Sequence, residues 1–300
     1  MRPALLAAAL LLAAPSARAA DSGCADIARS WEASHATLTP IQAHGLLLRA
    51  ADHGCTDAVA TMLDGGEPLE TADRMGNTAL THAARAGQVA LVQMLLGRGA
   101  DLAHRNASGS TALFSAVERN QTQVALLLLD RGASPDMRGR SDATPLAAAA
   151  FNANDAIVAA LLAHHADPRA ADRTGKPPIV YAAARASVPI VDRLLAAGID
   201  VNARYANDLT VLMWASGHAD DASEADGVAL VRDLLDRGAH VDDADNRGRT
   251  ALMIAAERGH AEIAKLLLAR GADPARRDDH GKTAADLAAN VAVRAVLTHG

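Results

Sequence analysis

The chain has 300 residues and a formal net charge of −6, and half of its residues are hydrophobic although only 2% are aromatic. The acidic balance argues against general binding to nucleic acids, which usually shows as an excess of basic residues. Large aromatic side chains normally fill the centre of a globular core. Their scarcity therefore favours thin helices that stack closely in an array.

The first residues are typical of a secretory signal peptide. Arg2 supplies a positive charge, residues 4–14 form an uninterrupted apolar stretch, and Ala17-Arg18-Ala19 fits the small-x-small cleavage pattern. The stretch is shorter than the about 20 residues that a membrane-spanning helix needs. A buried first helix is the alternative, but the stretch has no polar face. We expect residues 1–19 to be removed, residues 20–45 to form an N-terminal extension, and the mature protein to be periplasmic or secreted, without a membrane anchor.

The chain has two cysteines, Cys24 and Cys55. In an oxidising compartment such a pair usually forms a disulfide, and no Cys-x-x-Cys spacing favours redox chemistry. The sequence therefore predicts a structural Cys24–Cys55 disulfide between the N-terminal segment and the first repeat. Two free buried thiols and a redox pair are the alternatives.

Residues 46–300 repeat with a period of 33 residues, which indicates about seven to eight units. Two series of positions share this spacing, and both contain one longer step of 40, which places a seven-residue insertion near 219–225. One series is Thr78, Thr111, Thr144, Pro177, Thr210, Thr250 and Thr283, and the other is Gly66, Gly99, Gly132, His165, Gly198, Gly238 and Gly271. Agreement between two series, insertion included, makes a repeat protein the main interpretation.

Each unit predicts a pair of short helices. A threonine such as Thr78 can cap the first helix, because its hydroxyl accepts hydrogen bonds from the free backbone N–H groups there. An alanine pair such as Ala83-Ala84 follows, with side chains small enough for close stacking. The second helix carries a leucine stripe, as in residues 92–96, and ends at a glycine such as Gly99, which readily adopts positive φ.

These units resemble ankyrin repeats. The pattern D-x-x-G-x-T-x-L-x-x-A-A…L-L-x-x-G-A-D recurs in Asp73 to Asp101 and in Asp245 to Asp273. The family's Thr-Pro-Leu-His tetrapeptide is never complete, so we expect a less regular stack, and the unit from Leu46 to Asp73 is expected to be an N-terminal cap. The resemblance implies an all-α ankyrin-repeat solenoid of stacked helix-turn-helix units with β-hairpin-like connections, which works as an interaction scaffold.

No motif in the sequence predicts catalysis. Gly281-Lys282-Thr283 resembles the end of a phosphate-binding loop, but that loop needs a glycine at position 276, where the chain has Arg276. The repeat pattern explains the tripeptide. His-Glu-x-x-His and Gly-x-Ser-x-Gly motifs are absent from the sequence. We expect no enzymatic activity and no cofactor.

The insertion offers an alternative function, the binding of a cation or a small ligand by the acidic segment 218–226. Acidic residues before a glycine faintly resemble a calcium loop, but position 222 is alanine and no closing glutamate stands at the right spacing. A solvated loop is the main interpretation, and a partner contact is a third. The segment holds His218, Asp220, Asp221, Glu224 and Asp226, followed by Gly227.

The resemblance also implies where a partner protein binds. In ankyrin-repeat proteins the hairpin tips and the exposed faces of the first helices make a concave binding surface, and the position before the alanine pair faces it. Tyr181 and Trp214 occupy that position in adjacent repeats, so we expect them side by side, with Tyr205 flanking them. Exposed aromatic residues are preferred interface anchors; burial between repeats is the alternative.

The hairpin tips carry arginines although the chain is acidic, which suggests an acidic surface on the partner. The predicted partner-binding residues are His82, Phe151, Tyr181, Tyr205, Trp214, Arg140, Arg173 and Arg247. We expect a monomer that binds one partner protein, either to support a periplasmic enzyme or to neutralise a toxin.

Overall fold

The computed structural model describes residues 15–219 and 222–299. Most of the predicted signal peptide, residues 1–14, lies outside the described residues. The chain divides into two compact units, residues 1–101 and 102–300, which we call the N-terminal and the C-terminal unit. None of the helices described is long and apolar enough to cross a membrane.

The N-terminal unit consists of helices that pack in sequence order. Helix α1 contacts α2 and α3, and the pair α2–α3 packs on the pair α4–α5. Thr39 caps α2 in a capping box with Gln42, so that α2 starts before residue 46, where the sequence predicts the repeats to begin. The helices are α1 (Pro15–Ser34), α2 (Pro40–His53), α3 (Thr56–Asp64), α4 (Ala79–Ala86) and α5 (Val89–Gly97).

A disulfide joins Cys24 of α1 to Cys55, the residue that precedes α3. Their Cα atoms are 5.2 Å apart. Ile27 and Trp31 of α1 are buried, so α1 is held against the first helical pair both by apolar packing and by the covalent bond. The structure confirms the predicted disulfide.

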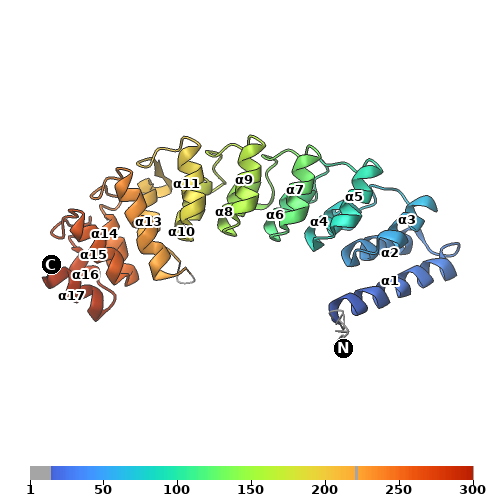
Figure 1. Ribbon diagram of the computed structural model, residues 1–300, viewed down its shortest axis with the longest axis horizontal. Coiled ribbons are helices and arrows are strands. Elements are labelled where there is room, and N and C mark those ends of the chain that lie inside the picture. The colour runs from blue at the N-terminus through green and yellow to red at the C-terminus, as the bar shows by residue number, and fades with distance from the viewer. Residues whose placement is uncertain (1–14, 220–221, 300) are drawn as a thin grey trace, which may run out of the picture. The chain divides into compact units, whose positions relative to one another are not determined.

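The C-terminal unit consists of helical pairs whose first and second helices form two rows (Figure 1). The first helices, α6, α8, α10, α12, α14 and α16, each contact the next one along the row. The second helices, α7, α9, α11, α13, α15 and α17, do the same. Their bounds are α6 (Ala112–Glu118), α7 (Thr122–Asp130), α8 (Pro145–Phe151), α9 (Asp155–Ala163), α10 (Pro178–Ala184), α11 (Val188–Ala196), α12 (Val211–Ser216), α13 (Glu224–Asp236), α14 (Ala251–Arg258), α15 (Ala261–Ala269), α16 (Ala284–Leu287) and α17 (Val291–His299).

The threonine series starts the first helices, as the sequence predicts. In every repeat that has this threonine, its side chain accepts a hydrogen bond from the backbone N–H three residues later, which satisfies one of the free donors of the helix start. The alanine pairs that follow are buried; Ala83 and Ala84, for example, are fully enclosed. Small side chains thus let neighbouring repeats approach closely.

Hairpin-like connections join the pairs. One connection contains the antiparallel strands β1 (Arg204–Tyr205) and β2 (Leu209–Thr210), with the short 3-10 helix η2 (Ala206–Asp208) between them. A second short 3-10 helix, η1 (Arg140–Asp142), stands at the equivalent place before α8. The predicted architecture of stacked helix-turn-helix units with hairpin-like connections is confirmed.

Candidate partner-binding surface

An aspartate organises most of the hairpins. The Oδ1 atom of Asp172 accepts hydrogen bonds from the backbone N–H groups of Thr174 and Lys176, two and four residues later. Asp73, Asp245 and Asp278 bind their own hairpins in the same way, and Asn106 does so with its amide oxygen. The second carboxylate oxygen is then free to bind a side chain of the first helix or of the hairpin itself.

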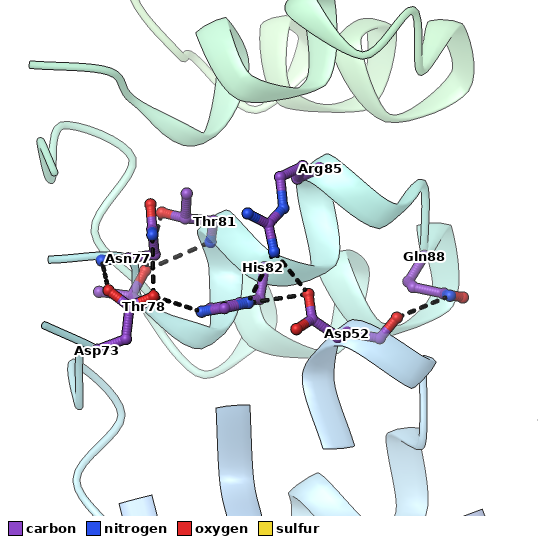
Figure 2. A network of polar contacts seen from close by, with 8 residues as sticks. All are labelled: Asp52, Asp73, Asn77, Thr78, Thr81, His82, Arg85 and Gln88. Carbon is purple, nitrogen blue, oxygen red and sulfur yellow. Dashed lines mark hydrogen bonds and ion pairs between the residues drawn. The ribbon is translucent and has the colours of Figure 1, made fainter. Parts of the chain in front are cut away.

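His82 lies between two carboxylates (Figure 2). Its Nδ1 atom is 2.9 Å from Oδ1 of Asp52 on α2, and its Nε2 atom is 3.2 Å from Oδ2 of Asp73 in the hairpin. Arg85 also reaches Asp52, at 3.2 Å. Because only 7% of His82 is exposed, the residue ties α2, the hairpin and α4 together and offers a partner little surface. His82 therefore has a structural role in the stack.

The hydrogen bonds to the hairpin aspartate also affect its pKa. Partial burial raises the pKa of Asp73, but hydrogen bonds from Asn77 and Met75 and the nearby His82 outweigh burial and lower it overall. The carboxylate is therefore charged at neutral pH and acts as an acceptor for the hairpin and for His82.

Tyr181 is bound to its hairpin in the same way. Its hydroxyl donates to Oδ2 of Asp172. Partial burial and this hydrogen bond raise the pKa of Tyr181 to about 12, so the hydroxyl keeps its proton at neutral pH. The pKa of Asp172 is lowered, because the hydrogen bonds from Tyr181, Thr174 and Lys176 outweigh the effect of burial.

Two hairpins lack both the organising aspartate and its asparagine counterpart. Gly139 and Tyr205 stand at its place, and the two tips turn through paired residues of positive φ instead. These φ values lie between 59° and 63°, and the four residues are Ser141, Asp142, Asn207 and Asp208. In these two repeats the organising position supplies no carboxylate to the residue that corresponds to His82 and Tyr181. These residues are Ala148 and Trp214.

A hollow of about 650 Å³ lies beside the first of these hairpins, over α6, α8 and α10. We call it the Phe151 groove, and the residues that line it include Phe114, Glu118, Arg119, Arg140, Ala148, Phe151, Asp172 and Tyr181. Gly139 lets the ring of Phe114 pack against the hairpin backbone, because a Cβ atom on this glycine would overlap the ring. Ala148 fills little of the space that Tyr181 fills in the next repeat.

The wall of the Phe151 groove is aromatic. The rings of Phe151 and Tyr181 meet edge to face, with centroids 6.1 Å apart and planes at 82°, an arrangement that aromatic pairs favour. Phe151 is nevertheless 56% exposed. The guanidinium carbon of Arg185 lies 5.9 Å from the centre of its ring, within reach of a cation–π interaction.

A second hollow, of about 500 Å³, lies beside the hairpin that has Tyr205 at the organising position, over α12 and α14. We call it the Trp214 groove, and Trp214, Arg247, Ile254 and Arg258 help to line it. The indole Nε1 of Trp214 is buried, and among the described residues no acceptor binds it. The cause is the hairpin, which has Tyr205 in place of the aspartate. Lys176 lies 5.2 Å from the centre of the indole ring.

The remaining predicted residues are dispersed. Tyr205 lines a separate hollow of about 220 Å³ with Arg169 and Asp200, where burial and the charge of Asp200 raise its pKa to about 12. Arg173 is exposed at a hairpin tip and lines neither groove. Tyr181 lines the Phe151 groove and Trp214 lines the Trp214 groove, and their expected place side by side on the neighbouring helices α10 and α12 stays a prediction.

Three arginines at or next to the grooves were not among the predicted residues: Arg119 and Arg258 line a groove each, and Arg185 lies against the ring of Phe151. Arg119, Arg185 and Arg258 all stand eight residues after the position that starts the first helix of their repeats, at the end of that helix. Their recurrence was the signal in the sequence that could have identified them. Arginine near a helix C-terminus also interacts favourably with the helix dipole, so the position combines a structural role with charge at the groove rim.

The acidic insertion contributes the first residues of helix α13. Ser223 caps α13 by accepting from the backbone N–H of Asp226, which makes this second helix longer than its counterparts. His218 is buried at 2% exposure and its ring stacks on that of His260 with centroids 4.2 Å apart. Over residues 15–219 and 222–299, no three or more His, Cys, Asp or Glu side chains are grouped as metal ligands. Asp220 and Asp221 lie outside the described residues, and cation binding stays a prediction.

Comparison with known protein families identifies the family to which the repeats belong. A family model of three ankyrin repeats matches residues 18–106, 47–139 and 146–224, and a model of many ankyrin repeats matches residues 234–288. The chain belongs to the ankyrin-repeat family. The ankyrin-repeat solenoid expected from the sequence is thereby confirmed.

Similar ankyrin-repeat proteins include ankyrin repeat domain-containing protein 63 of Homo sapiens, 45% identical over 67 residues, and its Mus musculus counterpart, 43% identical over 67 residues. The aligned part is 22% of this chain and only 17% and 16% of those proteins. Among solved structures, the ankyrin repeat domain of Bcl-3, a member of the IkappaB protein family, superposes with a TM-score of 0.59 at 26% identity. The match covers 75% of this chain and 99% of that domain.

Membership of the ankyrin-repeat family defines the class of activity. Ankyrin repeats are protein–protein interaction scaffolds, and the family is typically non-catalytic. The surface that such a scaffold offers is set by its variable side chains. In the C-terminal unit, the two grooves lie beside hairpins whose side chains depart from the repeat pattern at Gly139 and Tyr205.

Proposed function

We propose that this ankyrin-repeat protein is a periplasmic scaffold that binds one partner protein through the first-helix and hairpin surface of its C-terminal unit. The carrying observation is the pair of grooves, which place an aromatic side chain next to arginines at the two hairpins that lack the organising aspartate. Aromatic residues and arginine are the side chains that most often dominate binding energy at protein interfaces.

Export is supported by two features of the N-terminal region. The apolar residues 4–14 and the small residues at 17 and 19 fit a cleaved signal. The Cys24–Cys55 disulfide fits an oxidising compartment, because thiols stay reduced in the cytosol. In the periplasm, a scaffold of this kind would support an enzyme or neutralise a toxin by covering one of its surfaces.

The test begins with the full chain, expressed with its own N-terminus in a bacterium that has a periplasm. Partner proteins are cross-linked in cells and recovered with the wild type and with a Phe151→Ala/Trp214→Ala double variant. Met75→Ala is the matched control, because Met75 is also 56% exposed but lies in a hairpin of the N-terminal unit. We expect a partner that both the wild type and the control retain and that the double variant loses.

Two results would contradict the proposal. Retention of the chain in the cytoplasm with residues 1–19 intact would refute export. A purified partner that binds the wild type and the double variant with equal affinity would place the interface elsewhere on the chain.

A further inference from the structure

We propose that the Phe151 groove is an anchor pocket for a segment of a protein that carries an apolar side chain flanked by carboxylates. This inference rests on the proposed function and assigns the chemistry of the partner to one of the two grooves. The occupant follows from three properties of the groove, which are its shape, its apolar wall and the charge of its rim.

The shape results from two missing side chains. The hairpin has Gly139 where other repeats have an aspartate, and the first helix has Ala148 where the next repeats have Tyr181 and Trp214. In two other repeats a carboxylate and a ring fill this region by binding each other: Asp73 binds His82, and Asp172 binds Tyr181. The hollow of about 650 Å³ falls within the range of about 300–1,000 Å³ that is typical of binding pockets.

The wall of the pocket is apolar and partly solvated. Phe114 is buried and forms one side, whereas Phe151 leaves 56% of its surface exposed beside the edge-on ring of Tyr181. Contact with an apolar side chain would remove this surface from water, which is favourable. An exposed phenylalanine beside a preformed hollow therefore favours an apolar anchor.

The rim of the pocket carries two arginines, Arg119 and Arg140, and two carboxylates, Glu118 and Asp172. Arg119 is exposed, and none of the described carboxylates forms an ion pair with it. Arg140 pairs with Glu118 at 2.6 Å but keeps 71% of its side chain exposed. Arg185 does not line the hollow but covers part of the Phe151 ring. Glu118 is paired with Arg140, and Asp172 accepts hydrogen bonds from Tyr181 and from its own hairpin. Arg119 is therefore the charged group of the rim without a described counter-charge, and it would bind a carboxylate of the occupant.

The arrangement fits an extended protein segment better than a free small ligand. The apolar wall lies over α8 and α10, whereas Arg119 ends the preceding first helix and Arg140 lies in the hairpin, so the charged groups surround the hollow from different elements. A segment with one apolar residue between acidic residues can reach the hollow and the rim together. The partner predicted for this pocket is therefore an acidic stretch of a protein with a central aromatic or leucine side chain.

The test uses a short fluorescent peptide with a central phenylalanine flanked by glutamates, and its binding is measured by fluorescence anisotropy. Two control peptides carry either lysines for the glutamates or alanine for the phenylalanine. The decisive variant is Ala148→Tyr, which fills the pocket with the side chain of the next repeat and removes no wall residue. Phe151→Ala and Arg119→Glu test the wall and the rim, Met75→Ala is the matched control, and a melting curve shows that each variant is folded.

We expect the acidic peptide to bind the wild type and Met75→Ala alike, and both control peptides to bind at least about tenfold more weakly. Ala148→Tyr, Phe151→Ala and Arg119→Glu should each weaken binding by about tenfold or more. Equal binding to Ala148→Tyr, or no binding of the acidic peptide up to about 1 mM, would overturn the inference. A dimer of the wild type that Ala148→Tyr dissociates would assign the pocket to a second copy of the chain and would also overturn it.

The outcome separates this inference from the proposed function. A partner from the cross-linking experiment that binds Ala148→Tyr as well as the wild type would refute the pocket while the scaffold function stands. Loss of that partner in Ala148→Tyr, together with peptide binding, supports both.

Discussion

Replacing Tyr181 by phenylalanine removes the hydroxyl that donates to Asp172 and keeps the ring in place. A hydrogen bond to a charged group contributes about 1.5–3 kcal/mol when buried, and the partial exposure of Tyr181 reduces this to about 1–2 kcal/mol. Trp214→Phe makes the corresponding change where the hairpin aspartate is missing. This substitution removes the buried indole N–H, which has no acceptor among the described residues. Loss of the unsatisfied donor stabilises the fold, and the smaller ring packs less well. We therefore expect the free energy of unfolding to stay the same or to rise by up to about 1 kcal/mol.

The pair of variants is measured by urea unfolding, with thermal melting in parallel. A loss of 1 kcal/mol lowers the melting temperature by about 2–4 °C for a unit of this size. Tyr181→Phe should therefore melt a few degrees below the wild type, and Trp214→Phe at or above it. Equal destabilisation by the two changes would refute the explanation that the hairpin aspartate decides which ring has a partner.

The hydrogen bond between Tyr181 and Asp172 also predicts how the difference between wild type and Tyr181→Phe depends on pH. The pKa of Asp172 is lowered, so its contribution is present above the unfolded pKa of about 3.9 and is lost as pH falls through the lower folded value. The pKa of Tyr181 is raised to about 12, so its contribution is present below the unfolded value of about 10 and is lost as pH rises through the folded one. The difference should be constant between about pH 5 and 9 and should shrink on both sides; a difference that grows at either extreme would contradict the assignment.

Three other changes test the framework. Replacing Cys24 and Cys55 by serine should destabilise the N-terminal unit by about 2–4 kcal/mol in urea unfolding, and two thiols that react with alkylating agents in the exported wild type would contradict the disulfide. Deleting residues 219–225 restores the 33-residue spacing but removes the start of α13, so we expect cooperative unfolding with about 1–2 kcal/mol lost; loss of cooperativity would show that the insertion is essential. Gly139→Ala forces the ring of Phe114 to move and should cost about 1–3 kcal/mol, whereas an unchanged melting curve would contradict that close packing.

The repeat architecture could be predicted because its signals are local and periodic. Thr78 and its counterparts cap helices through a hydrogen bond within three residues, and the alanine pairs need only be small. The disulfide could also be predicted, since two cysteines in a chain that is expected to be exported leave one pairing. These features depend on residue type and spacing, both of which the sequence displays directly.

The candidate surface was harder to predict because it depends on contacts between segments. His82, Tyr181 and Trp214 share one position in the repeat, but their contacts differ. His82 is held by Asp52 of a neighbouring helix and by the aspartate of its own hairpin. Tyr181 binds its hairpin aspartate, whereas the indole N–H of Trp214 has no such acceptor. Tyr205 occupies the hairpin position of that aspartate and lines a different hollow. The Phe151 groove itself arises where the repeat has small residues, Gly139 and Ala148, in place of larger side chains. Small residues of this kind give no functional signal in the sequence.

The central claim is that a partner protein binds the first-helix and hairpin surface of the C-terminal unit, and amide hydrogen exchange of the full chain with and without the captured partner tests it most directly. Binding there should slow exchange in the hairpins around η1 and η2 and in the ends of α6, α8, α10 and α12, which border the two grooves. The second helices α7, α9 and α11 should exchange as in the free protein. Protection confined to those second helices, or to the N-terminal unit, would contradict the account.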